Sequence, residues 1–313
     1  MMEPGYESML ATAKAIASQR HAAESAVVKE IMHYELLQAL LEADAARSLV
    51  FQGGTALRLC YSGNRYSEDL DFAGGTAFDP VVMGEFKRRL TDNISSNYGL
   101  TVAVEERQAN PDDKIAVRRW KAKVHLPQEN RSLKQSHVIH LEVANIPAHT
   151  SEVRLVRPLS STAQYSYRSL MVKTESREEI LADKILALGD RPYLTHRDVW
   201  DIHMLEQAGV ELDSGLVKQK IIDYHLERSV FLEKLAERID VLKQSGTRRE
   251  FAVAMAQFLD GPLQPFLKDI TFLDQVFNAA VTISREAIAQ LERGGGEIEA
   301  SRHRPDRSGP LER

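Results

Sequence analysis

Residues 49–72 read LVFQGGTALRLCYSGNRYSEDLDF, a stretch that predicts a strand, a tight glycine turn, a short helix, a loop and a second strand. The apolar run 49–51 is typical of a buried strand, and Gly53 and Gly54 follow it directly. We expect residues 55–59 to form the first turns of a helix. The free N–H groups and the positive dipole end of such a helix are suited to binding phosphate.

Two aspartates lie in the second predicted strand. Asp69 and Asp71 are two residues apart, so both carboxylates project from one face of a strand, while Leu70 and Phe72 project from the other. Neighbouring carboxylates repel each other, and a divalent ion with oxygen ligands, most simply Mg²⁺, relieves that repulsion. A glycine pair alone is often only a turn, and an Asp-x-Asp pair is often only a solvated strand face. Their combination is more specific.

Together these motifs resemble those of the AbiEii/AbiGii-type nucleotidyltransferase toxins, within the DNA polymerase β-like nucleotidyltransferase superfamily. The family pattern is Gly-Gly-Thr-x-Leu followed by Arg-x-Ser-x-Asp-x-Asp. The matching residues are Gly53, Gly54, Thr55, Leu57, Arg65, Ser67, Asp69 and Asp71. The resemblance covers roughly residues 45–205. It implies an α+β fold with a polymerase β-like core, a mixed sheet flanked by helices, and a helical C-terminal part.

Length and composition are those of a soluble globular protein. The 313 residues can bury a sizeable core, and the net charge of −5 gives no overall attraction to nucleic acid, so an RNA contact would need local basic patches. Cys60 is the only cysteine, which excludes an intrachain disulfide and a cysteine-based metal site. We find no signal peptide pattern and no run of membrane-spanning length, and therefore expect a cytoplasmic protein with no membrane partner.

A third carboxylate lies in a later predicted strand. Residues 136–146, SHVIHLEVANI, place Glu142 among apolar residues. Burying an unpaired carboxylate is costly, so we expect a partner or a metal beside it, unless it lies on an exposed strand face. The family takes a third metal-associated carboxylate from such a strand, and the resemblance implies that Glu142 fills this position. The preceding strand, 115–126, alternates and carries Arg119, Lys121 and Lys123 on one face.

A second motif lies in the helical part. Ser176 and Glu179 form a capping-box pattern at the start of a helix that contains Lys184. Asp198 and Asp201 follow on one side of the next helix, and from the residues alone a lysine and two aspartates on neighbouring helices are more often salt-bridge partners than functional groups. The family pattern Ala-x-Lys-x-x-Ala-Leu, then Arg-Asp-x-x-Asp, matches this segment. The resemblance implies that Lys184 contacts nucleotide phosphates and that an aspartate acts with it; whether this is Asp198 or Asp201 stays open.

Changes in pattern along the chain predict its domains. We expect residues 1–174 to form a nucleotidyltransferase-like domain with N-terminal helices. Residues 175–292 should form a mainly helical domain that completes the active site. The tail 293–313 has almost no apolar content and is expected to be disordered.

The predicted function is nucleotide transfer from a nucleoside triphosphate (NTP) to an acceptor hydroxyl. Asp69, Asp71 and Glu142 would hold Mg²⁺ or Mn²⁺, and the glycine turn, Ser67 and Lys184 would bind the nucleotide. Thr55 would donate its hydroxyl to the triphosphate, Arg65 would contact the nucleotide or brace the loop, and Asp198 would position Lys184 or act as a base. The resemblance implies an RNA acceptor, the 3′ end of tRNA, and a cognate antitoxin encoded nearby in a type IV-like toxin–antitoxin or abortive-infection system. The alternatives are nucleotide transfer to a protein side chain and an inactive nucleotide- or RNA-binding module.

Overall fold

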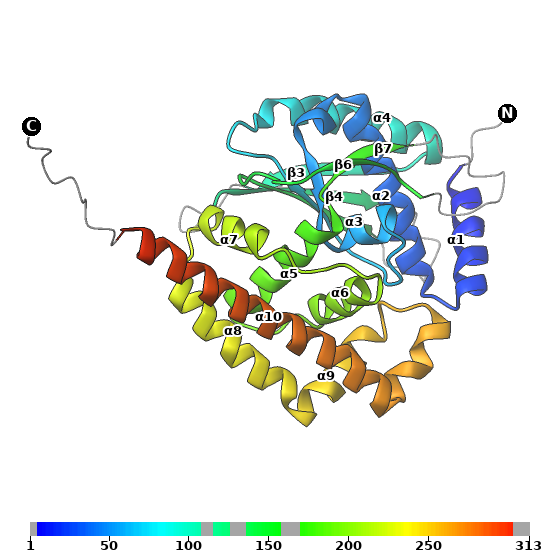
Figure 1. The fold of residues 1–313 in the computed structure, drawn as a ribbon. Coiled ribbons are helices and arrows are strands. Elements are labelled where there is room, and N and C mark those ends of the chain that lie inside the picture. The colour runs from blue at the N-terminus through cyan, green and yellow to red at the C-terminus, as the bar shows by residue number, and fades with distance from the viewer. Residues whose placement is uncertain (1–4, 108–114, 126–135, 158–169, 303–313) are drawn as a thin grey trace, which may run out of the picture.

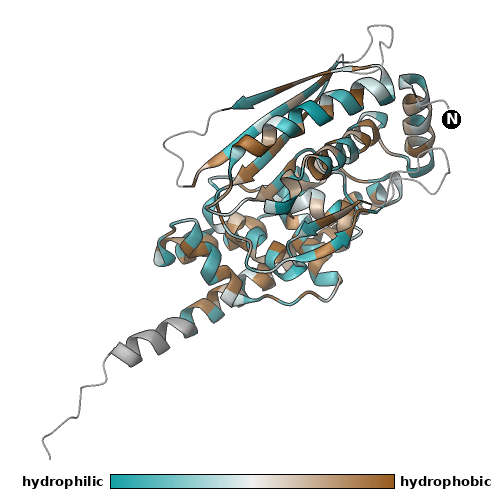
Figure 2. Cartoon of the chain, turned by 90° about the horizontal axis from the view of Figure 1, so that it is seen from above, coloured by the Kyte–Doolittle hydropathy of each residue, from teal (hydrophilic) through white to brown (hydrophobic). Residues whose placement is uncertain are grey.

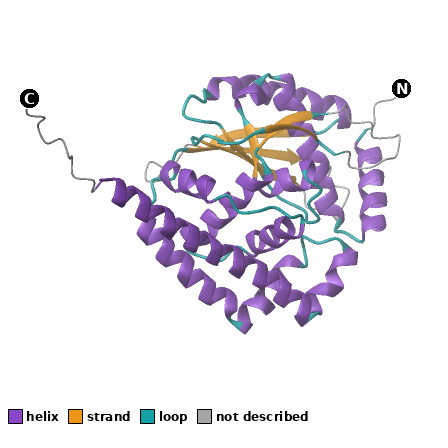
Figure 3. Ribbon diagram, in the orientation of Figure 1, coloured by secondary structure: helices purple, strands orange, loops and turns teal. Residues whose placement is uncertain are grey.

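The structure, a computed structural model, describes residues 5–107, 115–125, 136–157 and 170–302. Figure 1 shows two parts that pack together: a sheet with the N-terminal helices, drawn in blue to green, and the helices of the C-terminal half, drawn in green to red. Figure 3 shows the strands as a single layer between helices. The architecture is α+β, a mixed sheet with flanking helices and a helical C-terminal part, as the sequence predicts for a polymerase β-like core.

Seven strands form the sheet, in the order β3-β4-β5-β2-β1-β7-β6. They are β1 (Val50–Gln52), β2 (Leu70–Ala73), β3 (Thr101–Arg107), β4 (Val117–His125), β5 (Ser136–Ala144), β6 (Glu152–Leu155) and β7 (Met171–Thr174). The pairs β2–β5 and β1–β7 are parallel, and the other neighbours are antiparallel. Because β2 and β5 are interior neighbours, both strands with predicted catalytic carboxylates lie in the middle of the sheet.

The N-terminal helices cover one face of this sheet. They are α1 (Tyr6–Arg20), α2 (Glu24–Glu42), η1 (Ala45–Ser48), α3 (Gly53–Cys60), η2 (Pro80–Val82) and α4 (Met83–Tyr98). Helix α2 packs on β5 and α4 packs on β3, against the buried apolar side chains Trp120, Ile139 and Leu141. The opposite face of β4 and β5 carries the polar residues of the alternating pattern.

After β7 the described chain is entirely helical. The helices are α5 (Arg177–Asp190), α6 (His196–Gln207), α7 (Ser214–Asp223), α8 (Arg228–Lys243), α9 (Ser245–Met255), η3 (Gly261–Lys268) and α10 (Ile270–Arg302). The change from mixed to helical structure thus falls at Thr174, where the sequence pattern changes. One apolar core nevertheless contains residues from both sides of this point. The division into two domains at this point therefore stays a prediction.

The sequence prediction of the elements is largely confirmed. Strand β6 is an addition, because its four residues are too short for a clear alternation. Apolar residues of the C-terminal helices are expected to face the core, but Val230 and Ile270 are exposed; both lie in the first turn of a helix, ahead of the region that packs. Leu126 and the predicted loop 108–114 lie outside the described residues, and so does 303–313 of the predicted tail, which α10 enters as far as Arg302.

The core is made mainly by side chains between the sheet and the two groups of helices. Cys60 is buried there, as its apolar surroundings in the sequence predict. In Figure 2 hydrophilic and hydrophobic residues alternate along the helices, as expected for elements with one face on a core. No helix among the described residues is long and apolar enough to cross a membrane.

A buried ionic cluster attaches α7 to the start of α5. The Lys220 ammonium, fully buried, lies 2.9 Å from Glu175, 2.8 Å from Glu179 and 3.0 Å from Asp183. Glu179 also accepts hydrogen bonds from the backbone N–H groups of His149 and Thr150. The Ser176 side chain caps α5 by accepting a hydrogen bond from the Glu179 backbone N–H. In a full capping box the Glu179 carboxylate would accept a bond from the Ser176 backbone N–H, but here that carboxylate belongs to the ionic cluster.

Charge in this cluster is unbalanced, since three carboxylates surround one ammonium. Burial, together with the charge of Asp183, raises the pKa of Glu175 well above its usual range.

The cluster yields a test of stability. Lys220→Met would leave buried carboxylates without their cation and should lower the free energy of unfolding by about 3–5 kcal/mol. Glu175→Gln replaces one of three crowded carboxyl groups by a neutral group of the same shape and should cost less than about 1 kcal/mol. Lys218→Met, on the same helix without an ion pair in the described residues, is the matched control. Urea unfolding would measure all three, and a Glu175→Gln loss as large as that of Lys220→Met would contradict the excess of acidic groups in the cluster.

Candidate active site

The glycine turn joins β1 to α3 as the sequence predicts. Gly53 has φ +75°, a conformation that L side chains rarely adopt, and a Cβ there would lie 2.8 Å from Asp71 Oδ2. A Cβ on Gly54 would lie 2.1 Å from Arg65 Nη2. The first glycine thus lets the backbone approach the catalytic strand, and the second makes room for a guanidinium.

The carboxylates come together through the pairing of two strands. In the parallel register of β2 and β5, Asp71 lies beside Glu142. Leu70 and Phe72, of opposite parity, are buried in the core. This confirms the alternation read from the sequence and places the third carboxylate in the neighbouring strand.

Two of the three carboxylates already have partners. His140 donates its backbone N–H to Asp69 Oδ1 at 3.2 Å, and its ring Nδ1 lies 3.3 Å from the same oxygen. Arg119, the register neighbour of Glu142 on β4, donates from Nε to Glu142 Oε1 at 2.9 Å. His140, which the sequence motifs do not include, is therefore a neighbour of a predicted site carboxylate.

Asp71 accepts no hydrogen bond from any described residue. Burial raises its pKa to about 6, and the charges of Glu142 and Asp69 add to the effect. No group of three or more His, Cys, Asp or Glu side chains in the described ranges is arranged to hold a metal ion. The three carboxylates are adjacent and repel one another, but they do not converge on one point.

A basic cluster lies opposite, on the C-terminal helices. Lys184 on α5 contacts Asp198 at 2.8 Å and Asp201 at 2.9 Å, both on α6. Arg65 makes two hydrogen bonds of 2.6 Å to Asp201, and Arg191 lies 2.5 Å from Asp198. Asp198 and Asp201 thus lie on the same side of α6, as predicted, and both contact Lys184.

Electrostatics keep this cluster ionised. Burial alone would raise the pKa of Asp201, but the charges of Arg65 and Lys184 outweigh it and lower that pKa. Burial would likewise lower the pKa of Lys184, but Asp198 and Asp201 raise it. Three cations face two anions, so the cluster has one excess positive charge. The Arg191 side chain is 47% exposed, against 11% for Lys184, and therefore presents this charge to a ligand most openly.

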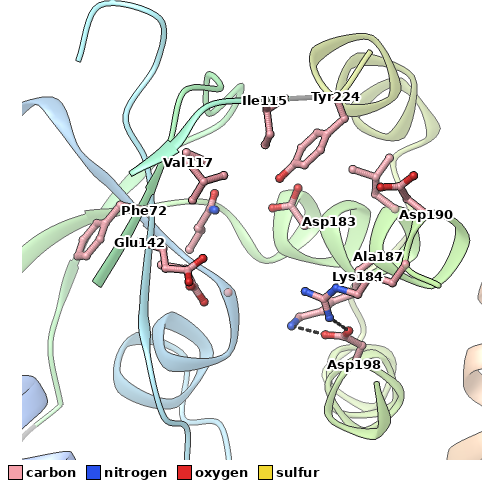
Figure 4. A pocket seen from close by; sticks show the side chains of 16 residues that line it. Phe72, Ile115, Val117, Glu142, Asp183, Lys184, Ala187, Asp190, Asp198 and Tyr224 are labelled. Carbon is pink, nitrogen blue, oxygen red and sulfur yellow. Dashed lines mark hydrogen bonds and ion pairs between the residues drawn. The ribbon is translucent and has the colours of Figure 1, made fainter. Parts of the chain in front are cut away.

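A cavity of about 250 Å³ separates the acidic and basic groups. Figure 4 shows Glu142 on the sheet side of it, with Lys184 and Asp198 on the helices opposite. The predicted site residues that line it are Gly53, Asp71, Glu142, Lys184 and Asp198. Gly54, Thr55 and Arg65 are buried behind its wall, while Ser67 and Asp69 line a second cavity.

Two predicted contacts take a different form in the structure. The Thr55 hydroxyl donates to the backbone carbonyl of Asp69 and is buried, so it fixes the carboxylate strand relative to the glycine turn. Arg65, for which the sequence left nucleotide contact or loop bracing open, uses its guanidinium on Asp201 and on the Tyr66 carbonyl and therefore braces the loop.

Several lining residues escaped the sequence analysis. Gln52, Asp183, Arg191 and Tyr224 line the first cavity, and Gln52 Oε1 is buried without a hydrogen-bond partner among the described residues. Arg191 follows Lys184 by seven residues, which is about two helical turns. This spacing alone predicts that the two side chains lie on the same side of the helix. Tyr224 comes from α7, and nothing in the local pattern marks it.

The space around Gly54 predicts a strong effect of one methyl group. Gly54→Ala should displace the Arg65 guanidinium from Asp201 and lower the free energy of unfolding by at least about 2 kcal/mol. Gly84→Ala is the control, because a Cβ on that helical glycine meets nothing within 4 Å; its stability should be unchanged or up to about 1 kcal/mol higher. Chemical denaturation measures both, and a tolerated Gly54→Ala would contradict the packing described.

The raised pKa of Asp71 predicts that the free energy of unfolding depends on pH. Between about pH 4 and pH 6 the folded state retains a proton that the unfolded state loses, so stability falls as the pH rises through this window. Asp71→Asn removes the charge and should be more stable than wild type by about 1–3 kcal/mol at pH 7.5 without divalent ions, and nearly equal at pH 4. Unfolding curves at both pH values would show it; a variant less stable at pH 7.5 would refute the repulsion.

Comparisons with known proteins identify the family of this chain. Residues 35–281 match the model of the family described as "Nucleotidyl transferase AbiEii toxin, Type IV TA system". None of the curated proteins compared matches the sequence. Among solved structures, JHP933 from Helicobacter pylori is 18% identical, with 90% of this chain and 100% of that chain covered and a TM-score of 0.44. A candidate nucleotidyltransferase from H. pylori is also 18% identical, with 87% and 98% covered and a TM-score of 0.45. Because the family model spans most of the sequence, the chain belongs to the AbiEii family of nucleotidyltransferase toxins of type IV toxin–antitoxin systems.

Proposed function

We propose that this enzyme is a metal-dependent toxin that transfers a nucleotide from an NTP to an RNA acceptor, the 3′ end of tRNA. The observation that carries the proposal is the cavity with Asp71 and Glu142 on the sheet side and with Lys184 and Arg191, beside Asp183, Asp190 and Asp198, on the helix side. The two cations would bind phosphate oxygens of a nucleoside triphosphate, and the carboxylates of the sheet would bind its divalent ion. The family's type IV systems imply an antitoxin as a further partner.

The donor set fits a divalent ion by its chemistry. Asp69, Asp71 and Glu142 supply the oxygen ligands that Mg²⁺ or Mn²⁺ prefers, and an ion would relieve the repulsion among them. Asp69 and Asp71 would hold the ion, and Glu142 would complete the set in exchange for its bond to Arg119. Such an ion lowers the pKa of a coordinated hydroxyl and neutralises charge on phosphate oxygens.

The remaining groups position the triphosphate. Helix α3 begins at Gly53 without a side-chain cap, and Gly53 lines the cavity, so its backbone N–H would meet phosphate oxygens. Arg191 and Lys184 supply positive charge from the opposite wall. Asp198 is bonded by both of these cations, which suits it to position them rather than to accept a proton. Ser67, predicted to contact the nucleotide, would do so from the edge of the second cavity.

The proposed reaction is one displacement at the α-phosphate. The acceptor hydroxyl forms a new P–O bond to the α-phosphorus, the bond between this phosphorus and the oxygen bridging to the β-phosphate breaks, and pyrophosphate leaves. The hydroxyl proton passes to a neighbouring carboxylate. Fixed positions and opposed charges supply most of the catalysis in such phosphate chemistry, in agreement with a site whose cations and anions are held by buried contacts.

RNA is favoured over a protein acceptor by charge near the carboxylates. Arg119, Lys121 and Lys123 share the sheet face on which Glu142 lies, because strand residues of equal parity point the same way. A polynucleotide backbone would meet these cations. An inactive binding module is disfavoured by the presence of all three carboxylates, of which Asp71 and Glu142 line this cavity and Asp69 lines its neighbour.

A transfer assay tests the proposal. The protein would be incubated with Mg²⁺, total tRNA and each α-labelled NTP in turn, and label should appear on tRNA. Asp71→Asn should reduce the rate by about 10³-fold or more, because several kcal/mol of transition-state stabilisation would be lost. Asp92→Asn, at an exposed position on α4, is the control and should leave the rate unchanged.

Binding provides a readout that does not depend on turnover. Mg²⁺ with a non-hydrolysable NTP should raise the melting temperature of the wild type and of Asp92→Asn but not that of Asp71→Asn. Label on a co-purified protein instead of tRNA would transfer the proposal to protein nucleotidylation. Nucleotide binding without transfer to any acceptor would identify a binding module.

A further inference from the structure

A second cavity, of about 490 Å³, lies next to the catalytic carboxylates along the same two strands. Asp69 lines it, whereas Asp71, two residues farther along the chain, lines the first cavity. On β5 the same division holds: Val138 and His140 line the second cavity and Glu142 lines the first. The row of carboxylates therefore runs from one cavity to the other.

A transfer reaction needs two substrates that meet at the same catalytic groups. The first cavity combines acidic and basic walls and suits a triphosphate, and this leaves the acceptor to approach Asp69 from the opposite side. We infer that the second cavity holds the 3′-terminal nucleotide of the RNA acceptor, with its hydroxyl directed at Asp69. The inference rests on the proposed function and adds the place and direction of acceptor entry.

The walls of the second cavity are fixed by contacts between distant segments. Glu68 lies 3.2 Å from Arg197 on α6 and 3.8 Å from Lys29 on α2, and its backbone carbonyl is 3.1 Å from the His33 ring. The Arg197 guanidinium in turn lies 5.0 Å from the centre of the Phe258 ring, which lines the cavity. Its volume is within the range of about 300–1,000 Å³ typical of ligand sites.

The lining can recognise a nucleoside. The His140 side chain is 39% exposed and contacts Asp69, so it is close to the position proposed for the attacking hydroxyl. Phe258 offers an aromatic face of the kind on which bases stack. Ser25 and Gln257, both exposed at the cavity, supply polar groups for base edges or ribose.

Two lysines extend this site along the sheet. In the β4–β5 register Lys121 is opposite His140 and Lys123 is opposite Val138, and both of these β5 residues line the cavity. Within the described residues no ion pair involves either lysine, and both are only partly buried. Their free charge lies where the phosphates that precede a bound 3′ nucleotide would run, which favours RNA over a protein acceptor.

Filling the cavity tests its role. Ser25→Trp and Gln257→Trp place large rings at exposed positions on its wall and should raise KM for tRNA at least about tenfold, while KM for the NTP stays unchanged. Val253→Trp is the matched control, because Val253 is 75% exposed on α9, four residues from Gln257, and does not line the cavity. Unfolding curves for the three variants verify that each remains folded.

Charge on the sheet gives an independent test. Lys121→Gln/Lys123→Gln should reduce the slope of log affinity against log salt for tRNA by about 1–2, as expected when phosphate contacts are lost. Arg118→Gln removes a cation from the other face of β4 and should leave the slope unchanged. Affinity is measured by fluorescence anisotropy of labelled tRNA in the Asp71→Asn background, so the result does not depend on catalysis.

The outcomes separate this inference from the proposed function. Transfer to tRNA by the wild type, with unchanged tRNA KM in both tryptophan variants, would overturn the acceptor site and leave the function standing. Absence of transfer and of tRNA binding in the wild type would overturn both. Label on a protein, lost in the tryptophan variants, would keep the cavity as an acceptor site but overturn its assignment to RNA.

Discussion

The buried pair of Arg65 and Asp201 connects the two parts of the molecule beside the candidate active site. Its two hydrogen bonds of 2.6 Å join the loop before the carboxylate strand to the helix that also holds Lys184. Removing both charges from water costs free energy that their attraction does not fully return, so the pair is weak evidence for stability. Its value is geometric: it fixes the separation between the acidic sheet and the basic helices. Gly54 provides the space that this contact needs.

Buried charges are arranged in opposite ways on the two sides of the site, the helices and the sheet. On the helices, each carboxylate is matched by a cation, and the cluster stays ionised. On the sheet, Asp71 is buried beside other carboxylates and accepts no bond from a cation in the described residues; burial first, and then the charges of Glu142 and Asp69, raise its pKa. A positively charged ligand can therefore stabilise the carboxylates of the sheet far more than the ion-paired cluster of the helices. Binding is therefore expected to change the sheet side most.

The sequence predicted the local geometry well and the distant contacts poorly. The parity of Asp69, Leu70 and Asp71, the glycine turn and the Ser176 cap follow from backbone rules that act within a few residues. The bonds of Thr55 to the Asp69 carbonyl and of Glu179 to Lys220 depend on which segments the fold brings together, and no local rule contains this. His140 was undervalued for the same reason, because its contact with Asp69 arises from the pairing of β5 with β2. The metal, the nucleotide roles and the domain boundary stay predictions.

The brevity of β2 has an evolutionary consequence. Its four residues alternate between the core and the catalytic face, and Asp69 continues the same alternation one residue earlier. Loss or gain of one residue here would turn the acids into the core and Leu70 and Phe72 into the cavity. A change of length in this segment would therefore affect both the stability of the core and the position of the acidic side chains. Diversification among related enzymes should therefore tolerate changes of length in the loops on either side of β2 but not within it.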